Sequence, residues 1–298
     1  MNTPTRARLS LGPVLYHWPR EMLLKFYADI AKTPVDIIYL GETVCAKRRS
    51  MKLSDWLALG RELHQAGKEI ILSSLALIEA GSEIGALRRL CENGEFSVEA
   101  NDLAAVQILE QSKLGFVGGA SLNVYNHHTL KLLTVSGMFR WVMPVELSQP
   151  AFVDICKLKP PEVQSEVFAF GRLPLAWSAR CFTARARKLP KDNCQMCCGE
   201  DPDGLLLSTR DDQEFLVLNG IQTQSAQTFN LLTHDPGADI DILRISPQST
   251  RMLEIIAVFD EWRQGTLDTA RTGTALARSM PCGPCNGYWL GQAGMNNT

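Results

Sequence analysis

The sequence predicts an α/β protein, a (β/α)8 TIM-like barrel. Short apolar runs rich in β-branched residues alternate with amphipathic helical stretches from the N-terminus to about residue 160, which is typical of parallel strands with helices packed outside. A glycine stands between a predicted helix and the next strand at four places: Gly67, Gly94, Gly115 and Gly137. Because glycine tolerates positive φ, it commonly ends a helix. An open doubly wound sheet is the alternative to a closed barrel.

The strands follow from apolar runs bounded by turn residues. The second reads Val-Asp-Ile-Ile-Tyr-Leu, and the third reads Glu-Ile-Ile-Leu-Ser-Ser, both rich in strand-forming side chains. In chain order the eight predicted strands are 11–16, 35–40, 69–74, 95–99, 116–122, 139–145, 166–170 and 240–245. Apolar residues at helical spacing fill the segments between them. The predicted helices include 20–32, 53–66, 83–92, 102–111, 127–135 and 250–263. Eight such units can close a barrel.

The chain 1–298 is expected to be a single barrel domain with a cysteine-bearing insertion, 173–235, after about the seventh strand. The insertion contains a turn-rich stretch at 199–204 and a hairpin through 215–221. Functional loops of such barrels follow the carboxyl ends of the strands. The insertion and Cys45, just after the second strand, are therefore expected over the barrel mouth.

Bulk properties narrow the function classes. A net charge of −2 and a pI near 6.2 give no basic surplus for a phosphate backbone, so no nucleic-acid partner is expected. No apolar run is long enough for a membrane span or follows the first residues as in a secretory signal, so the protein is expected to be cytoplasmic. Nine cysteines are then expected to be reduced, which favours ligation over disulfides.

A cluster of cysteines in the insertion indicates a metal site. Cys181, Cys194, Cys197 and Cys198 lie within eighteen positions, among arginines and lysines that are expected to favour thiolates. Cys45 can complete a set of four with three of them. Spacing leaves the third insertion ligand open between Cys197 and Cys198. An iron–sulfur cluster fits better than zinc, because zinc ribbons need two compact C-x2-C-like knuckles and only one is present.

Other motifs carry less chemistry. Cys282-Gly-Pro-Cys285 copies a thioredoxin-type redox motif but lacks the strand and helix that such a motif needs. Cys91 and Cys156 are interpreted as packing residues on helices. The sequence has no nucleophile elbow, no phosphate-binding glycine loop and no helical histidine pair. Glu42, Arg180 and Asn123 are expected near the barrel mouth, either as reacting groups or as hydrogen-bond partners of the ligand sulfurs. The sequence assigns no catalytic residue.

Several segments resemble peptidase family U32. They include Ile-Tyr-Leu-Gly-Glu-Thr-Val-Cys at 38–45, Arg-Trp-Val-Met-Pro-Val-Glu-Leu-Ser at 140–148, Leu-Pro-Leu-Ala-Trp-Ser-Ala-Arg-Cys-Phe-Thr-Ala-Arg at 173–185 and Cys-Asn-Gly-Tyr-Trp at 285–289. The resemblance covers nearly the whole chain. It implies a [4Fe–4S] cluster held by Cys45, Cys181, Cys194 and Cys198, and so favours Cys198 over Cys197.

The resemblance also implies a function. Similar family members take part in oxygen-independent hydroxylation of the ring of a prenylated ubiquinone precursor, as a heterodimer with a homologous U32 protein, and related ones use prephenate as the oxygen donor. An iron–sulfur hydroxylase component is therefore expected. The alternatives are a non-catalytic scaffold or electron-transfer subunit, and a U32-type peptidase, for which the residues offer no hydrolytic constellation. The extra Cys282 departs from the family's pattern.

Overall fold

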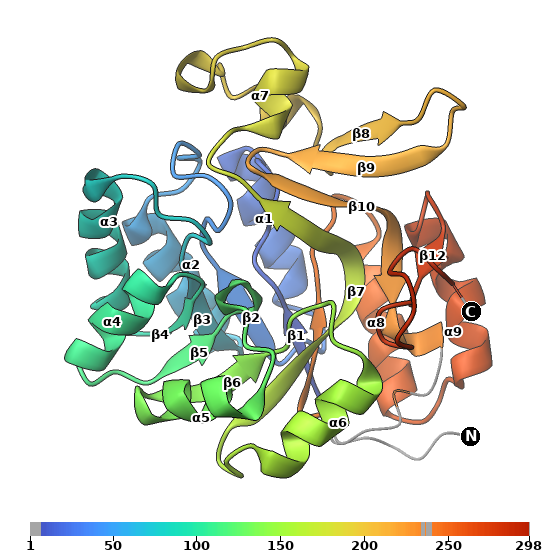
Figure 1. The fold of residues 1–298 in the computed structure, drawn as a ribbon, viewed down its shortest axis with the longest axis horizontal. Coiled ribbons are helices and arrows are strands. Elements are labelled where there is room, and N and C mark those ends of the chain that lie inside the picture. Colours follow the sequence, from blue (N-terminus) through green and yellow to red (C-terminus); the bar gives the residue numbers. More distant parts are fainter. Residues whose placement is uncertain (1–6, 234–235, 237–239, 298) are drawn as a thin grey trace.

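The fold is built on a closed barrel of parallel strands. The computed structural model describes residues 7–233, 236 and 240–297. The barrel strands in these ranges are β1 (Arg8–Leu11), β2 (Ile37–Leu40), β3 (Glu69–Ser73), β4 (Ser97–Ala100), β5 (Phe116–Gly118), β6 (Met138–Val142), β7 (Gln164–Trp177) and β11 (Ile242–Ile245). Each pairs in parallel with the next, and β11 pairs with both β7 and β1, which closes the ring. Figure 1 labels β1 to β7 of this ring. The predicted (β/α)8 barrel is confirmed.

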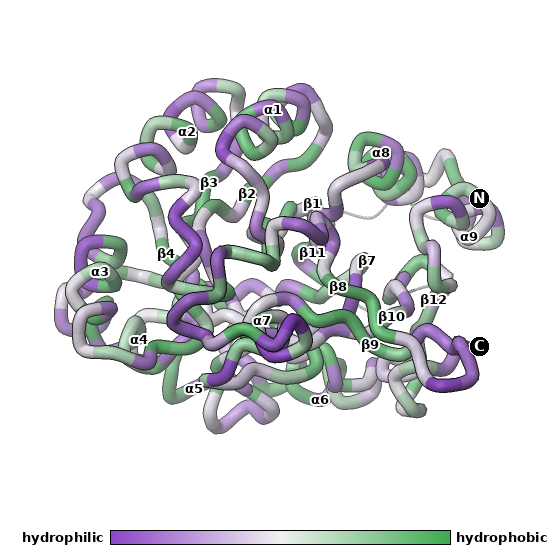
Figure 2. Tube along the Cα trace, turned by 90° about the horizontal axis from the view of Figure 1, so that it is seen from above, coloured by the Kyte–Doolittle hydropathy of each residue, from purple (hydrophilic) through white to green (hydrophobic). Residues whose placement is uncertain are grey.

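Helices surround this barrel, as the view from above shows (Figure 2). They are α1 (Arg20–Ile30), α2 (Leu53–Gln65), α3 (Gly81–Cys91), α4 (Leu103–Gln111), α5 (His127–Val135), α6 (Gln149–Leu158) and α8 (Met252–Arg263). Each buries one apolar stripe against the strands; on α1 this stripe is Leu23, Tyr27 and Ile30. Side-chain caps fix where α4 and α5 begin, because Asp102 accepts from the Ala104 amide and Asn126 accepts from the Thr129 amide.

Two predicted boundaries are wrong for identifiable reasons. The first strand was expected at 11–16 but lies at Arg8–Leu11, because Gly12 and Pro13 end the pairing with β11 and Pro13 has no amide to donate. Gly115 was expected to end a helix through positive φ. In the structure Lys113 takes the left-handed conformation there, with a φ of 55°, and Gly115 instead leaves room for the Phe139 ring.

The seventh strand is longer than expected because its second half leaves the barrel and joins an antiparallel extension. Its partner is β10 (Gln222–Asn230), with Trp177 opposite Gln222 and Gly171 opposite Phe229. The extension continues through β9 (Glu214–Asn219) and β8 (Leu205–Ser208), and β12 (Pro284–Cys285) pairs in parallel with β10. Figure 1 places β8, β9 and α7 (Phe182–Ala186) beyond the ends of the barrel strands. The insertion therefore lies over the barrel mouth.

Shorter elements complete the chain. They are α9 (Thr269–Leu276) and the 3-10 turns η1 (Ala120–Leu122), η2 (Lys191–Asn193), η3 (Cys197–Glu200), η4 (Leu231–Thr233) and η5 (Ala277–Ser279). Across the residues described, every helix is too short or too polar to span a membrane.

Candidate metal centre

Two loops carry the predicted ligands to one place. Cys45 lies in the loop after β2, and Cys181 is the residue before α7. Cys194 ends η2 and Cys198 lies in η3. The Lys47 ammonium ties the two loops together, since it donates to the Lys191 carbonyl (2.9 Å) and to the Asp192 carboxylate (2.8 Å). The barrel thus presents one cysteine and the insertion presents the others.

The four cysteines lie close enough for the charge of one thiolate to affect the pKa of another. Cys198 raises the pKa of Cys45, and both Cys45 and Cys194 raise the pKa of Cys181. All are free cysteines. Among the described residues, no three His, Cys, Asp or Glu side chains converge on the position of a single metal ion. A zinc ion would need sulfurs about 2.3 Å from one point, whereas a cluster of several irons holds its thiolates farther apart.

Burial, rather than the surrounding cations, dominates the ionisation of these thiols. It raises the pKa of Cys45, of Cys181 and of Cys198, and hydrogen bonds and Arg48 offset only part of this effect. The expectation that the cationic run favours thiolates is therefore wrong for these three cysteines. Arg180 and Arg185, which belong to that run, lie exposed to solvent, where their charges are screened.

Arg48 is a buried cation beside the thiols that sequence reasoning missed. Its guanidinium donates from Nη1 to the Leu15 carbonyl (2.7 Å) and from Nη2 to Asn219 Oδ1 (2.8 Å). Its charge lowers the pKa of Cys198, against the larger opposing effect of burial. The signal that could have found part of this arrangement is Gly220, which opens the two-residue hairpin loop Gly220-Ile221, since glycine is typical of the first position of such a loop; Asn219 is the strand residue just before it.

Cys197 lies among the same thiols as Cys198, since Cys198, Cys181 and Cys194 all affect its pKa. Cys197 is buried, whereas Cys198 is half-buried. The choice of Cys198 as the ligand stays a prediction from the family resemblance. Cys285 is also buried, and burial raises its pKa to about 12. Since it lies on β12 rather than at a helix N-terminus, the Cys282-Cys285 pair lacks the setting that activates a redox thiol.

The three neighbouring residues singled out from the sequence have different positions. Glu42 accepts from the amides of Val44 (2.9 Å) and Cys45 (3.0 Å), so it shapes the loop that carries Cys45. Arg180 and Asn123 are exposed. Glu42 therefore holds the loop of Cys45 in shape, whereas the side chains of Arg180 and Asn123 remain at the surface.

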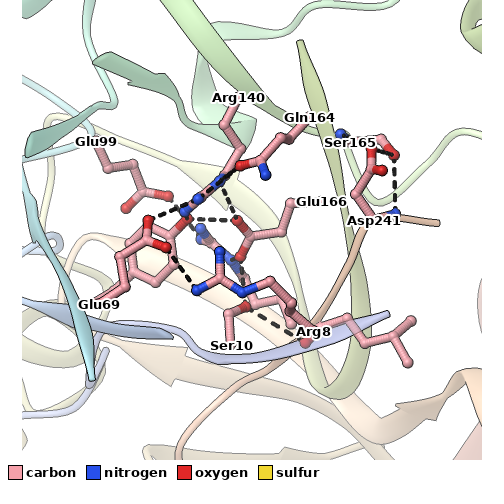
Figure 3. Close-up of polar contacts among 12 residues, drawn as sticks. Arg8, Ser10, Glu69, Glu99, Arg140, Gln164, Ser165, Glu166 and Asp241 are labelled. Carbon is pink, nitrogen blue, oxygen red and sulfur yellow. Dashed lines mark hydrogen bonds and ion pairs between the residues drawn. The ribbon is translucent and has the colours of Figure 1, made fainter. Parts of the chain in front are cut away.

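Below the mouth, the barrel interior holds a network of charged side chains (Figure 3). Glu166 accepts from Ser10 Oγ (2.6 Å), from Arg244 Nε (2.7 Å) and from the Tyr39 hydroxyl. Arg244 also pairs with Glu99 at 2.7 Å. Burial alone would raise the pKa of Glu166, but Arg244 and Arg140 outweigh it, so the pKa lies below its usual value. Glu166 is therefore an anion in the folded protein.

The chain is similar to known proteins along most of its length. A sequence profile described as peptidase family U32 matches residues 24–253. A solved U32 peptidase, Mk0906, has 11% sequence identity and a TM-score of 0.48, over 83% of this chain and 95% of that chain. A tryptophan synthase complex from Pyrococcus furiosus has 9% identity and a TM-score of 0.41, over 88% of this chain and 94% of the other. The barrel assignment rests on the strand pairings described above.

Proposed function

The chain belongs to peptidase family U32, and from that premise we propose that it is the iron–sulfur component of an oxygen-independent hydroxylase. The observation that supports the proposal is that Cys45, Cys181, Cys194, Cys197 and Cys198 lie close enough to affect one another's pKa, and we assign Cys45, Cys181, Cys194 and Cys198 as the ligands. Four thiolates are the usual ligand set of a [4Fe–4S] cluster. When bound, such a cluster supplies one-electron transfer.

The surroundings of the thiols fit a cluster that carries negative charge. Arg48 is buried, and its charge lowers the pKa of Cys198. A buried cation near a ligand sulfur stabilises the charge of the thiolate. Glu42 holds the amides of the Cys45 loop, so this ligand is oriented before any metal arrives. These residues position the ligands.

The finer role follows the family resemblance. We assign to this chain a role like that of UbiV, which acts in anaerobic ubiquinone biosynthesis. The substrate is then the ring of a prenylated quinone precursor, the oxygen donor is prephenate, and a UbiU-like member of the same family is the partner in a heterodimer.

Proteolysis is less well supported by the geometry. A hydroxyl-to-imidazole contact in the described chain joins Ser50 Oγ and His17 Nδ1 at 3.5 Å. Burial, followed by the charge of Arg48, lowers the pKa of His17. No carboxylate among the described residues bonds to this ring to orient it, as a hydrolytic triad needs.

The proposal is tested in a deletion strain. We expect ubiquinone formation to stop in the absence of oxygen, an under-hydroxylated prenylated precursor to accumulate, and aerobic synthesis to continue. Restoring the wild-type chain should restore the quinone, whereas a Cys45→Ala chain should not. Normal anaerobic quinone levels in the deletion strain would rule out the hydroxylase role.

A further inference from the structure

A cavity opens at the barrel mouth beside the cysteines, at the carboxyl ends of the strands. Its apolar wall comprises Leu15, Val142, Met143, Val145, Phe168 and Trp177. Its polar wall includes Thr43, Glu99, Asn101, Gln222 and Arg244. Leu15 packs with Val44 and Ile221 in a small cluster that Cys45, Cys181 and Trp177 also contact. The cavity and the candidate metal centre therefore share a wall.

Four side chains of this cavity carry a buried polar atom without a hydrogen-bond partner in the described chain: Thr43 Oγ1, Glu99 Oε1, Gln222 Nε2 and Arg244 Nη2. Glu99 Oε1 is nevertheless ion-paired with Arg244 Nη1 at 2.7 Å, which leaves three atoms without a partner. The exposed fractions of Thr43, Gln222 and Arg244 are 5%, 0% and 8%. A buried polar group left unpaired costs about 1–3 kcal/mol, and native proteins contain few of them. Three around one cavity indicate a ligand that supplies the missing partners.

The existing hydrogen bonds of Gln222 and Arg244 determine which of their atoms remain free to bind a ligand. The Gln222 oxygen already accepts from Asn219 Nδ2 (3.3 Å) and from Gln224 Nε2 (2.9 Å), so its amide nitrogen is the free group. Arg244 uses Nε on Glu166 and Nη1 on Glu99, which leaves Nη2. Gln222 and Arg244 can only donate with these atoms, whereas the Thr43 hydroxyl can donate or accept. The site therefore recognises an oxygen that accepts hydrogen bonds.

The charges argue for a neutral ligand. The linked network below the cavity contains three arginines and three glutamates: Arg8, Arg140, Arg244, Glu69, Glu99 and Glu166. Their formal charges cancel. A further buried carboxylate would have no counter-ion, and an unpaired buried charge is strongly disfavoured. A phenol or carbonyl oxygen meets the donors without that cost.

From this geometry we infer that the barrel mouth binds a neutral ring with an oxygen substituent, a phenol or quinone head group. Arg244, Gln222 and Thr43 bind the oxygen, and the apolar wall with Trp177 and Phe168 covers the ring. The inference rests on the proposed function for the identity of the natural ligand, the quinone precursor. It assigns the ring to this chain rather than to a partner, next to the four cysteines.

The test uses three small probes on the full chain that share a methyl-substituted ring and differ in the group opposite the methyl. They are 4-methylphenol, toluene and 4-methylbenzoate, and binding is followed by ligand-observed NMR and by tryptophan fluorescence. We expect 4-methylphenol to bind at least about tenfold more tightly than the other two, the value of one good hydrogen bond. Equal binding of toluene would reduce the site to an apolar pocket, and tighter binding of 4-methylbenzoate would make it an anion site. Either result overturns the inference, as does a lack of binding by all three.

Variants separate the site from general packing. Thr43→Val and Gln222→Met should each weaken 4-methylphenol about five- to tenfold and leave toluene unchanged. Gln224→Met is the matched control, because it loses the same bond to Gln222 but does not line the cavity. Arg244→Met is less suitable, since it also leaves Glu166 and Glu99 unpaired in the core. Unchanged 4-methylphenol affinity in both cavity variants would contradict the assignment.

The outcomes for the two proposals can be told apart. Probe binding is measured on metal-free protein, and iron and sulfide are measured separately. A chain that binds iron and sulfide but no phenol would sink only the cavity site, whereas phenol binding without iron would sink only the cluster.

Discussion

Arg48 and Asn219 join the loop that carries Cys45 to the turn between β9 and β10, with Arg48 Nη2 2.8 Å from Asn219 Oδ1. Both side chains also donate to one acceptor, the Leu15 carbonyl, at 2.7 and 2.8 Å. The buried pair Arg48 and Asn219 thus holds together three segments that are far apart in the chain. Because the charge of Arg48 also acts on Cys45 and Cys198, this pair of side chains lies beside the thiols.

Removing the Arg48 guanidinium should loosen the metal centre. Arg48→Met leaves the Leu15 carbonyl and Asn219 with fewer partners and Glu42 without its nearest cation. We expect a loss of about 3 kcal/mol in the free energy of unfolding, measured by urea denaturation. Arg49→Met is the control, because Arg49 is exposed and should change stability by less than about 0.5 kcal/mol. Equal stability of the two variants would contradict the structural role of Arg48.

The turn at Gly220 should not tolerate a side chain. Its φ is 63°, and an added Cβ would lie 2.9 Å from Arg48 Nη2. We expect Gly220→Ala to cost about 2 kcal/mol, from the left-handed backbone and the displaced guanidinium. Gly273 in α9 has open space around it, so Gly273→Ala should be neutral or stabilising by up to about 1 kcal/mol. Thermal unfolding of the pair measures both, and a Gly220→Ala protein as stable as Gly273→Ala would refute the close approach.

The charge of Glu166 should make stability depend on pH on the acid side. Its pKa is lowered in the folded state, so its contribution is fully present above the unfolded value of about 4.3 and is lost as pH falls through the folded pKa. We expect Glu166→Gln to cost about 3–5 kcal/mol at pH 7 and less below pH ~4. The exposed Glu162→Gln should cost little at either pH. A difference between wild type and Glu166→Gln that stays constant from pH 7 to about 3 would show that the charge contributes nothing.

The barrel could be predicted from sequence because its strands and helices are encoded locally. The run Ile37–Leu40 is apolar throughout, as a strand buried on both faces must be, and Asp102 and Asn126 cap their own helices. The extension was harder to predict, because the second half of β7 is a strand only through its pairing with β10. Trp177 and its partner Gln222, for example, are 45 positions apart in the chain. Long-range pairing leaves little local signal.

The candidate site could be predicted in part. Cysteine identity and spacing pointed to Cys45 and the insertion, because thiols are chemically distinctive wherever they stand. Arg48 and the barrel network could not be found this way. In the sequence Arg48 stands between Lys47 and Arg49, which suggests a solvated run, and only the tertiary structure buries it. Glu166 and Arg244 likewise meet because β7 and β11 are neighbours.

The most direct test of the account is iron and acid-labile sulfide analysis of single alanine variants, purified without oxygen and compared with wild type. Wild type should show an absorbance band at about 400 nm and should contain iron and acid-labile sulfide in equal amounts. Cys45→Ala, Cys181→Ala, Cys194→Ala and Cys198→Ala should each lose most of both, because an iron is left without its thiolate. Cys197→Ala, the matched control from the same turn, should keep them. Full iron and sulfide in the Cys45→Ala protein would contradict a cluster shared between the barrel and the insertion.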